Sequence, residues 1–390
     1  MRILTFTSLY PNTEFPNHGV FVEERMRKYR ERHDVEITVV APVPWFPLRS
    51  RRFGDYSRYA RIPPQENRYG MKIYHPRYPV IPKVGMSLAP FLMAAWTYPL
   101  MARLKRSFGP CMIDAHYFYP DGVAASLLAG WLSLPFTVTA RGTDLNLIPS
   151  FRIPRYLIAK AARKCARVIT VCAALADAAR EISGEHVPIS VLRNGVDLER
   201  FHPGDRVEAR KKYGLDADMP LLLSVGLLIE RKGHDIVIRS LKALSGVQLA
   251  IAGEGELRDH LVRLAHEEGV AQRVHFLGAV PHDEMPALFR AADATVLASS
   301  REGWANVILE SMACGTPVVA SRIWGTPEVI RERAAGRLVD ERTPEAFAKT
   351  IHELLEDGVD RNQVRAYAER FDWWSTVDGL HEIFLNVCGA

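Results

Sequence analysis

Residues Ser299 to Pro327 read SSREGWANVILESMACGTPVVASRIWGTP, and this stretch decides the fold. The apolar run Ala294 to Ser299 that leads into it is the kind a buried parallel strand needs. NVILESMA, from Asn306 to Ala313, has apolar residues at helical spacing. The turn therefore joins the carboxyl end of a strand to the amino end of a helix. In an open parallel sheet, ligands bind in the crevice outside such strand ends, and the unpaired amides of a helix start favour a phosphate.

Two glutamates flank this turn, Glu302 in the loop and Glu310 in the helix. A diphosphate joined to a sugar on one side and a ribose on the other fits that layout, because amides would bind the phosphates and carboxylates the hydroxyls. The alternative is a pair of ordinary surface residues, since glutamate is also favoured near a helix start.

The segment closely resembles the donor-site signature of the retaining, GT-B-fold glycosyltransferases of family 4, in which E-x7-E is followed by ACGTPVVAS. The resemblance implies that Glu302 lies beside the hydroxyls of the donor sugar and has a catalytic role. It implies that Glu310 binds the ribose of the nucleotide. The residues expected to bind substrate alongside it are Gly303, Trp304, Ala305, Asn306 and Val307.

A second motif, SVGLLIERKGHD, runs from a strand through a glycine turn to the start of a helix. Arg231 and Lys232 would hold the diphosphate there and stabilise the charge that grows on the leaving phosphate. The family usually has an arginine early in this loop, where this chain has Leu227. We predict that Arg231 replaces it. The alternative is that both cations are solvated residues of a first helical turn.

A third segment, IAGEGELRDHL, is again a strand, a glycine turn and a helix, and it resembles the GxGP-type loop of the family. Glu256 stands where proline is common. Glycine is favoured in any tight turn of this kind, so the segment gains its meaning from the two motifs around it. The substrate-binding residues expected from these two loops are Gly226, Gly253 and Glu254.

The amino-terminal half offers a further loop, SLYPNTEFPNHGVFVEERM, where the family has a glycine-rich loop close to the donor diphosphate and the acceptor. Gly19 fits a close backbone approach. His18 either binds phosphate or caps the loop.

TARGTDLNLIP resembles a family loop in which histidine is usual, but this chain has Arg141 at that position. An arginine side chain cannot act as a base because it stays protonated. Retaining enzymes of this class are thought to use the donor's own leaving phosphate oxygen as the base, and Arg141 would then bind the phosphate or an anionic acceptor. His116, in DAHYFYPDG, either touches the sugar or is a core histidine.

Length and composition predict two α/β domains. The chain has 390 residues, a length that exceeds what one hydrophobic core usually supports. Its composition, 48% apolar and 24% charged residues, is ordinary for a globular protein. Short apolar runs alternate with helical stretches throughout. The expected strands are RILTFTS, EITVVAP, IDAHY, FTVTARG, RVITVC and ISVLRNG, then LLLSVGLL, QLAIAG, VHFLG, ATVLAS, PVVAS and GRLVD.

The predicted fold class is therefore α/β, with two Rossmann-like parallel-sheet domains that the resemblance places across a deep interdomain cleft. Residues 1–198 form the acceptor-binding domain and residues 199–371 the nucleotide-sugar-binding domain. Residues 372–390 form a helix that returns to the first domain.

Charge is uneven along the chain. Residues 1–190 carry 26 basic and 14 acidic side chains, and much of this excess lies between Arg51 and Pro110, interleaved with aromatic residues. Such a surface fits an anionic membrane better than nucleic acid, because a lipid-linked acceptor would lie there. The alternative is a solvated basic face. The apolar run Val84 to Ala102 is long enough to span a bilayer, but prolines and polar residues interrupt it. We expect a helix packed on the first sheet.

The first residues lack the regions of a signal peptide, which predicts a cytoplasmic protein, at the inner face of the cell membrane if it meets a membrane. Five cysteines have no zinc or disulfide spacing and are expected to be reduced. No metal or other cofactor is expected. The only DxD triplet, Asp216 to Asp218, fits a surface turn.

The sequence thus predicts a retaining, metal-independent hexosyltransferase that uses a UDP- or GDP-linked sugar and a glycan or lipid-linked glycan acceptor, in cell-surface or exopolysaccharide synthesis. Two alternatives stay open. One is a nucleotide-sugar epimerase on the same fold. The other is an inactive subunit that binds the donor, because Leu227 and Arg141 depart from the family pattern.

Overall fold

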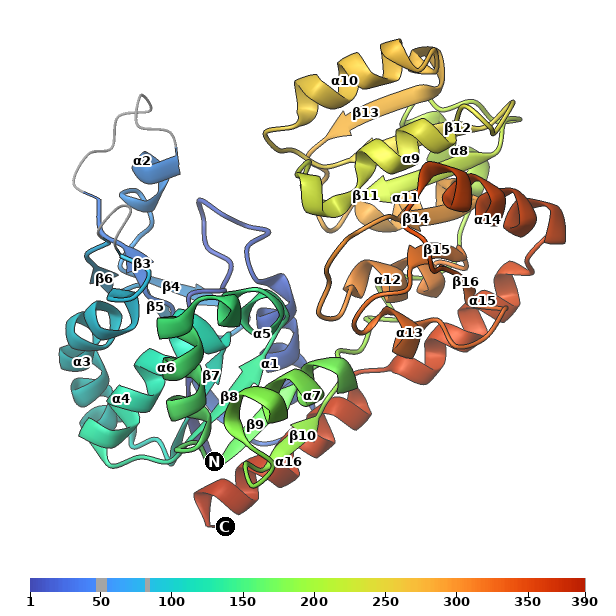
Figure 1. Cartoon of the computed structure of the whole chain (residues 1–390). Helices are drawn as coiled ribbons and strands as arrows, with labels where there is room; N and C mark the ends of the chain where they lie inside the picture. Colours follow the sequence, from blue (N-terminus) through green and yellow to red (C-terminus); the bar gives the residue numbers. More distant parts are fainter. Residues whose placement is uncertain (47–54, 81–84, 390) are drawn as a thin grey trace. The chain divides into compact units, whose positions relative to one another are not determined.

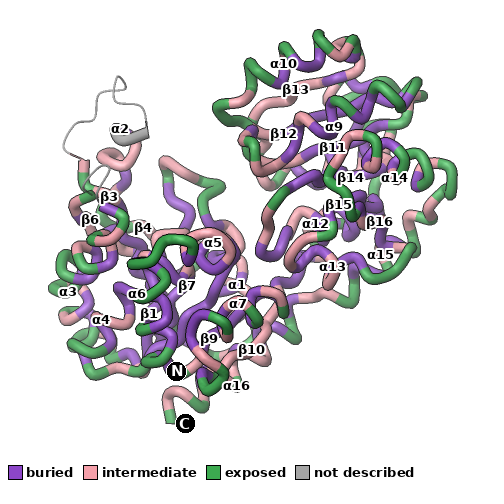
Figure 2. The backbone as a smooth tube through the Cα atoms, viewed as in Figure 1, coloured by how far each residue is buried: buried purple, intermediate pink, exposed green. Residues whose placement is uncertain are grey.

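The computed structural model describes residues 1–46, 55–80 and 85–389, and the chain divides into two compact units (Figure 1). Unit 1 comprises Met1–Asn194 together with the carboxyl-terminal segment from Trp374, and unit 2 comprises Gly195–Trp373. The domain limits expected at residues 198 and 371 lie close to these positions. Each unit has its own hydrophobic core, and the central strands of both sheets are buried (Figure 2).

Unit 1 is built on an eight-stranded sheet with the order β10-β9-β8-β7-β1-β2-β5-β4. All neighbouring strands are parallel except the β4–β5 pair at one edge. The strands are β1 (Arg2–Phe6), β2 (Glu36–Val40), β4 (Gln65–Arg68), β5 (Met71–Tyr74), β7 (Met112–His116), β8 (Phe136–Ala140), β9 (Arg167–Thr170) and β10 (Ile189–Val191). A separate short pair joins β3 (Val43–Pro44) to β6 (Arg77–Tyr78).

The helices of unit 1 form two rows. They are α1 (Val20–Arg32), α2 (Asp55–Tyr59), α3 (Ala89–Phe108), α4 (Val123–Leu132), α5 (Thr143–Asn146), α6 (Arg152–Ala162), α7 (Ala173–Ser183) and α16 (Trp374–Cys388). The chain steps from β1 to β2 in one direction and from β7 through β10 in the other. Because parallel crossovers are right-handed, α1 and the row α4, α6 and α7 cover opposite faces of the sheet.

Unit 2 has a six-stranded, fully parallel sheet with the order β13-β12-β11-β14-β15-β16. Its strands are β11 (Leu221–Val225), β12 (Gln248–Ala252), β13 (Val274–Gly278), β14 (Ala294–Leu297), β15 (Val318–Ser321) and β16 (Gly336–Val339). Its helices are α8 (Arg206–Lys212), α9 (His234–Ser240), α10 (Arg258–Glu267), α11 (Met285–Ala291), α12 (Asn306–Ala313), α13 (Thr326–Val329), α14 (Pro344–Asp357) and α15 (Arg361–Ala368).

All twelve expected strands are present, and the expectation of two parallel-sheet α/β units is confirmed. The sequence reading missed the β4–β5 hairpin. Strand β4 is the polar, largely exposed QENR, which lacks the apolar alternation that marks a half-buried strand. Its turn, Tyr69–Gly70, has positive φ at both residues, as a tight hairpin turn requires.

Helix α3 begins at Ala89 and continues to Phe108, so it extends beyond the apolar run that predicted it. Its buried face carries Met93, Thr97 and Met101. Pro99 lies inside the helix. Lys83 and Val84, which bound the run, fall outside the described residues. Of the helices in the described parts of the chain, none is both long and apolar enough to cross a membrane.

The carboxyl-terminal helix α16 packs against α1 in unit 1 (Figure 1). Three of its apolar side chains, Val377, Leu380 and Phe384, are fully buried in the core of that unit. The helix therefore belongs to unit 1 through its core and not only through surface contacts.

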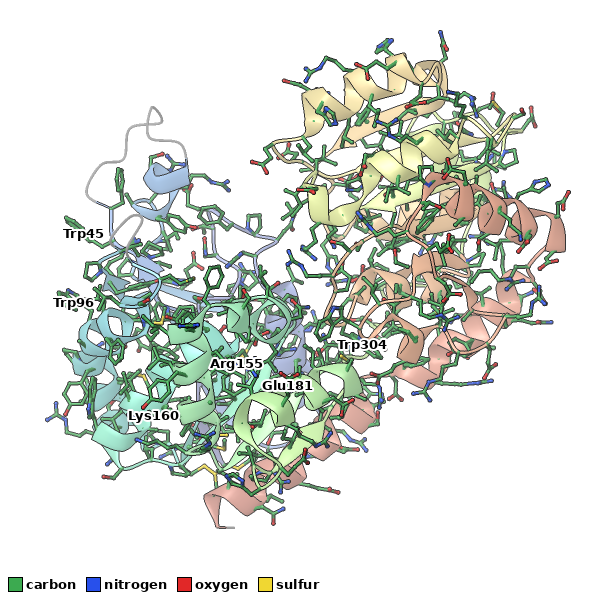
Figure 3. All side chains as sticks on the ribbon, in the orientation of Figure 1. Trp45, Trp96, Arg155, Lys160, Glu181 and Trp304 are labelled. Atoms are coloured by element: carbon green, nitrogen blue, oxygen red, sulfur yellow. A yellow bond between two sulfur atoms is a disulfide. The ribbon has the colours of Figure 1, made fainter. Side chains whose placement is uncertain are left out.

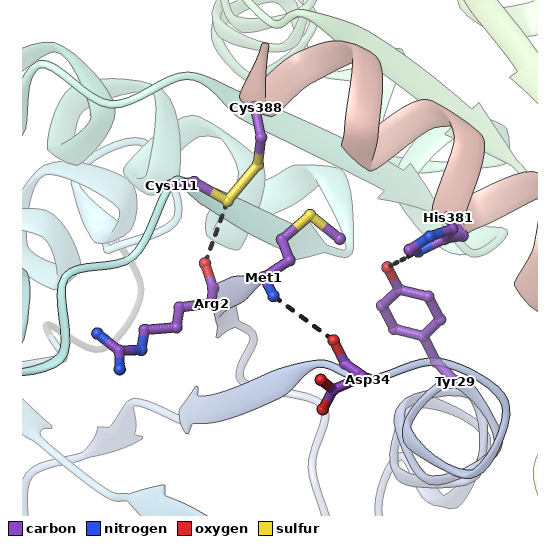
Figure 4. The surroundings of a disulfide bond; sticks show 7 residues. All are labelled: Met1, Arg2, Tyr29, Asp34, Cys111, His381 and Cys388. Carbon is purple, nitrogen blue, oxygen red and sulfur yellow. Dashed lines mark hydrogen bonds between the residues drawn. A yellow bond between two sulfur atoms is a disulfide. The ribbon is translucent and has the colours of Figure 1, made fainter. Parts of the chain in front are cut away.

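The expectation that all cysteines are reduced is wrong for two of them. Cys111, just before β7, and Cys388, at the end of α16, form a disulfide with a Cα–Cα distance of 5.5 Å (Figure 4). They are 277 residues apart in sequence, and only the packing of α16 brings them together. Cys165, Cys172 and Cys314 are buried and form no disulfide within the part of the chain that the structure describes.

Candidate active site

The loops that follow β11 and β14 in unit 2 bring three of the predicted residues together. Lys232 Nζ donates to Glu302 Oε1 at 2.6 Å, and Arg231 Nη1 lies 3.5 Å from Glu302 Oε2. The two loops are neighbours because β11 and β14 pair in the sheet. They are also tied through backbone groups, since Ser300 N donates to the carbonyl of Arg231 at 2.8 Å. Arg231 Nη1 in turn donates to the carbonyl of Arg301 at 2.8 Å.

Glu302 is a carboxylate in this arrangement. Burial by itself would raise the pKa of Glu302, but the charge and the hydrogen bond of Lys232 outweigh it and hold the pKa below its ordinary value. Only 12% of the Glu302 side chain and 15% of the Lys232 side chain are exposed, so solvent screens the pair weakly. Leu227, at the position of the family's usual arginine, is exposed.

The two glycine loops after β11 and β12 lie against each other. A Cβ atom on Gly253 would meet the carbonyl oxygen of Gly226 at 1.8 Å, and both glycines have positive φ. Leu228 N donates to the carbonyl of Glu254 at 2.9 Å. Glycine is thus required at these positions by the approach of the two backbones, whatever ligand they bind. Glu254 is exposed.

His234, which the sequence reading left without a role, fixes the loop that carries Lys232. Its Nδ1 and the Ser224 hydroxyl are 2.9 Å apart, and its Nε2 lies 3.3 Å from the carbonyl oxygen of Leu227. That carbonyl can only accept, so Nε2 donates and Nδ1 accepts from Ser224. Burial lowers the pKa of His234 to about 4, and the charge of Lys232 acts in the same direction. The imidazole is therefore neutral.

Glu310 has a partner that the sequence reading missed. His282, in the turn that precedes α11, places its Nε2 3.1 Å from Glu310 Oε1. Arg200 Nη1 donates to His282 Nδ1 at 3.0 Å, which leaves Nε2 as the donor to the carboxylate. The signal in the sequence was the PHDE turn at the end of β13, at the same sheet edge as the other two loops.

The residues between the two glutamates have different surroundings. Gly303, Trp304 and Ala305 are buried, whereas Asn306 and Val307 are partly exposed. The ring of Trp304, labelled in Figure 3, lies 6.5 Å from the ring of Phe371 in the same unit. A contact of Trp304 with the sugar stays a prediction.

In unit 1, the ends of β7 and β8 bring Arg141 and His116 together. Arg141 Nη2 donates to His116 Nδ1 at 2.6 Å, and His116 Nε2 donates to Asp114 Oδ2 at 2.9 Å. His116 is fully buried, and burial lowers its pKa to about 4. Both ring nitrogens are hydrogen-bonded, so in this geometry His116 links the side chains of Arg141 and Asp114. A direct contact of His116 with substrate stays a prediction.

The first loop of unit 1 places Gly19 at the start of α1. A Cβ atom there would lie 2.3 Å from the carbonyl oxygen of Leu9, and the φ of Gly19 is +72°. The close backbone approach at Gly19 is therefore to Leu9 of the same loop. His18 is exposed, with its ring 6.5 Å from that of Phe15. No contact of His18 or Gly19 identifies a ligand.

The predicted residues thus form two groups within the described chain. Unit 2 holds the pairs Lys232–Glu302 and His282–Glu310, and unit 1 holds the pair Arg141–His116. In each unit the group lies at the carboxyl ends of parallel strands, which is where open α/β sheets bind ligands.

Comparison with protein families matches both units. The family model of glycosyl transferases group 1 matches residues 205–371, and that of Glycosyltransferase Family 4 matches residues 19–200. The putative teichuronic acid biosynthesis glycosyltransferase TuaC of Bacillus subtilis is 27% identical over 397 residues, which cover 99% of each chain. The D-inositol 3-phosphate glycosyltransferase of Mycobacterium tuberculosis is 36% identical over 228 residues, 55% of this chain and 48% of that protein.

Solved structures share the fold. Sucrose-phosphate synthase from Thermosynechococcus elongatus has a TM-score of 0.81 at 17% identity, with 99% of this chain and 98% of that chain covered. Anabaena HepE in complex with UDP has a TM-score of 0.75 at 20% identity, with 99% and 100% covered. The chain is therefore a GT-B-fold glycosyltransferase and belongs to the group 1 glycosyltransferases of family 4.

Proposed function

We propose that the protein is a retaining hexosyltransferase that moves a sugar from a UDP- or GDP-linked donor to a hydroxyl of a glycan or lipid-linked glycan. The observation that carries the proposal is the Lys232–Glu302 pair, in which a cation and a sugar-binding carboxylate meet at adjacent strand ends. The solved complex of HepE with UDP supports a nucleotide-linked donor. The name of TuaC supports a role in cell-surface polysaccharide synthesis.

In the proposed mechanism, the donor diphosphate replaces Glu302 as the partner of Lys232 and Arg231. Glu302 is then free to accept hydrogen bonds from the sugar, and Glu310 does the same for the ribose. The bond from the anomeric carbon to the phosphate oxygen breaks, and the acceptor oxygen bonds to that carbon on the same face. The acceptor proton passes to the leaving phosphate oxygen. The two cations stabilise the charge of the leaving group, so the proposal needs no metal.

Nucleotide binding tests the donor site. We expect one of UDP, GDP and ADP to bind in calorimetry, with affinity at least about tenfold weaker in Lys232→Ala and Glu310→Ala. Lys242→Ala is the control, because this lysine is 73% exposed in the same unit. Nuclear magnetic resonance of the product then reads the anomeric configuration. An inverted product would exclude the retaining mechanism, and the absence of nucleotide binding would exclude the donor site.

Two incubations separate the alternatives. Without acceptor, an epimerase would convert the donor into a second nucleotide sugar, and a transferase would not. Over a broad acceptor panel, an inactive subunit would bind nucleotide without any transfer. The inactive subunit is considered because the exposed Leu227 stands at the position of the family's arginine.

We also propose that unit 1 meets the inner face of an anionic membrane through α3, α4 and α6. These helices contain no aspartate or glutamate, and the sequence has none from residue 67 to 113 or from 145 to 176. Helices α3 and α4 join through an edge contact between Tyr98 and Trp131, whose ring centroids are 5.7 Å apart.

Both kinds of side chain that favour a membrane interface are exposed on this face. The large apolar ones are Leu88, Phe91, Trp96, Tyr98, Trp131, Phe151, Ile153 and Tyr156. The basic ones are Arg103, Lys105, Arg106, Arg152, Arg155 and Lys160. Trp96, Arg155 and Lys160 are labelled in Figure 3. Tryptophan and tyrosine prefer the headgroup level, and each cation near an anionic leaflet contributes about 1 kcal/mol.

Sedimentation with vesicles tests this face. The protein should bind vesicles that contain phosphatidylglycerol, bind less at high salt, and not bind pure phosphatidylcholine. Trp96→Ser and the pair Lys105→Glu with Arg106→Glu should each weaken binding. Arg258→Glu, an exposed change in unit 2, is the control. Equal binding to both kinds of vesicle, or none, would contradict the proposal.

A further inference from the structure

Two buried arginines in unit 1 make no direct contact with an acidic side chain among the described residues, and the nearby Asp114 carboxylate acts on both only through its charge. Arg25, on α1, is fully buried, and Arg141, at the end of β8, is 9% exposed. Among the residues that the structure describes, neither guanidinium group forms an ion pair with a carboxylate. Buried charges in proteins are normally paired, because an unpaired one loses its hydration without compensation.

The two side chains share neutral acceptors instead. Arg25 Nη2 donates to the carbonyl of Leu192 and to Asn194 Oδ1, both at 2.9 Å. Arg141 Nη1 donates to the same Asn194 oxygen at 3.1 Å, and Arg141 Nη2 donates to His116 Nδ1. Within the described parts of the chain, the Nε atoms of both arginines and Nη1 of Arg25 have no hydrogen-bond partner. Two positive charges therefore meet on one amide oxygen.

The electrostatics agree with this geometry. Burial lowers the pKa of Arg25 to about 10 and that of Arg141 well below its ordinary value. For Arg141, the nearby charge of Arg25 lowers the pKa further. Arg25 remains protonated at neutral pH. An anion placed here would relieve both the burial cost and the mutual repulsion.

Arg141 is held in one orientation by groups behind it. Arginine only donates, so His116 Nδ1 accepts, and His116 Nε2 carries the proton that it donates to Asp114. Thr137 donates to the other oxygen of Asp114 at 3.1 Å. The guanidinium of Arg141 also lies over the ring of Phe21, with its carbon 5.2 Å from the ring centroid. Two of its five N–H donors are bonded, and of the other three the one on Nε is buried.

Two backbone amides of this loop are already bonded to a carboxylate. The Asp144 carboxylate accepts from the amides of Arg141, Gly142 and Phe118, at 2.7 to 3.1 Å. These amides are therefore occupied. The guanidinium group of Arg141, at the end of β8, still has N–H donors that can receive a negative group.

We propose that Arg141 is an anion-binding residue that selects a saccharide substrate bearing a carboxylate or a phosphate. Asp114 and His116 act as positioning residues, and the charge of Arg25 strengthens the attraction. The proposal rests on the proposed function and adds the chemical class of the sugar. A planar guanidinium group with several free donors suits a carboxylate or phosphate better than a neutral hydroxyl.

The experiment compares charged and neutral sugars with the full chain. In the donor arm, binding of UDP-glucuronate and UDP-glucose is measured by calorimetry. In the acceptor arm, transfer is measured to disaccharides that end in glucuronate, in a sugar phosphate or in glucose. Arg141→Gln removes the charge, and Arg141→Lys retains it. Arg2→Gln, which changes an arginine of unit 1 that is 53% exposed, is the control. A melting curve confirms that each variant is folded.

We expect a preference of at least tenfold for the anionic sugar in one arm, which identifies whether the donor or the acceptor carries the negative group. Arg141→Gln should bring the ratio close to one, Arg141→Lys should restore part of it, and the control should leave it unchanged. Equal use of charged and neutral sugars by the unmodified protein, or a preference that survives in Arg141→Gln, would overturn the inference. Absence of nucleotide binding and of all transfer would instead refute the proposed function.

Discussion

At the residue scale, the Lys232–Glu302 pair joins two roles that the sequence could only assign separately. In the protein without ligand, Glu302 is the counter-ion of Lys232, with Nζ and Oε1 2.6 Å apart. In the proposed mechanism, a phosphate of the donor displaces this carboxylate from the cation. That mechanism predicts that donor binding and sugar positioning are coupled through this hydrogen bond.

Glu302→Gln should separate the two roles. The variant removes a negative charge that competes with the diphosphate, so UDP should bind at least as tightly as before. Transfer should fall by about 10²-fold or more, because the contact with the sugar weakens. Calorimetry gives the first quantity and kcat the second. Glu256→Gln, in the neighbouring loop, is the matched control and should change neither. Loss of UDP binding in parallel with transfer would show that Glu302 only supports the loop.

His234 should make unit 2 sensitive to acid. Its folded pKa of about 4 lies below the ordinary histidine value of about 6.5, so only the unfolded chain gains a proton between these values. Stability is therefore lost as pH falls through this window, by about 1.4 kcal/mol per pH unit. The difference between the unmodified protein and His234→Gln in urea unfolding should follow this slope. His352→Gln, which alters an exposed histidine of α14, should keep the slope of the unmodified protein. Identical slopes in both variants would contradict the assignment.

At the element scale, α16 is attached to unit 1 in two ways. Its apolar face is buried in the core of unit 1, and its last residue is tied to the start of β7 by the Cys111–Cys388 disulfide. Nearby, the Tyr29 hydroxyl and His381 Nδ1 are hydrogen-bonded at 3.0 Å, and the amino group of Met1 donates to the carbonyl of Asp34 (Figure 4). Residues from the carboxyl-terminal end of the chain are thereby packed against α1 and crosslinked to the start of β7.

Reduction of this disulfide should destabilise unit 1 by about 2–4 kcal/mol, because the crosslink restricts the unfolded chain. The midpoint of thermal unfolding should fall when dithiothreitol is added to the unmodified protein. Cys388→Ser should unfold at that lower temperature with or without the reductant. If the unmodified protein kept its midpoint after complete reduction, verified by thiol titration, the disulfide would have no part in the stability of the unit.

At the scale of the whole molecule, the two units carry separate cores and separate groups of candidate site residues. Nucleotide should therefore stabilise them unequally. UDP at about 100 times its Kd should slow exchange of the most protected amides of β11 and β12 by roughly 100-fold. Amides of β1 and β7 in unit 1 should change little. Hydrogen exchange by mass spectrometry reads both sets in one sample, and equal slowing in both units would contradict a nucleotide site confined to unit 2.

Much of the fold could be read from local patterns. Apolar runs of strand length, glycine turns and helical spacing located all twelve expected strands, because each pattern is complete within a few residues. The donor motif is likewise contained in one strand, one turn and one helix. The β4–β5 hairpin was not predicted, because its outer strand is polar and largely exposed and so lacks an apolar pattern.

The sequence by itself determined that the chain is a two-unit α/β glycosyltransferase, and it named Glu302, Glu310 and Lys232. The tertiary structure alone decided which side chains meet. Lys232 and Glu302 are 70 residues apart, Arg25 and Asn194 are 169 apart, and Cys111 and Cys388 are 277 apart. The physical reason is that propensity and periodicity act between near neighbours in the chain. Strand order and the packing of the last helix set the distant contacts, and the charges that remain unpaired become visible only in those contacts.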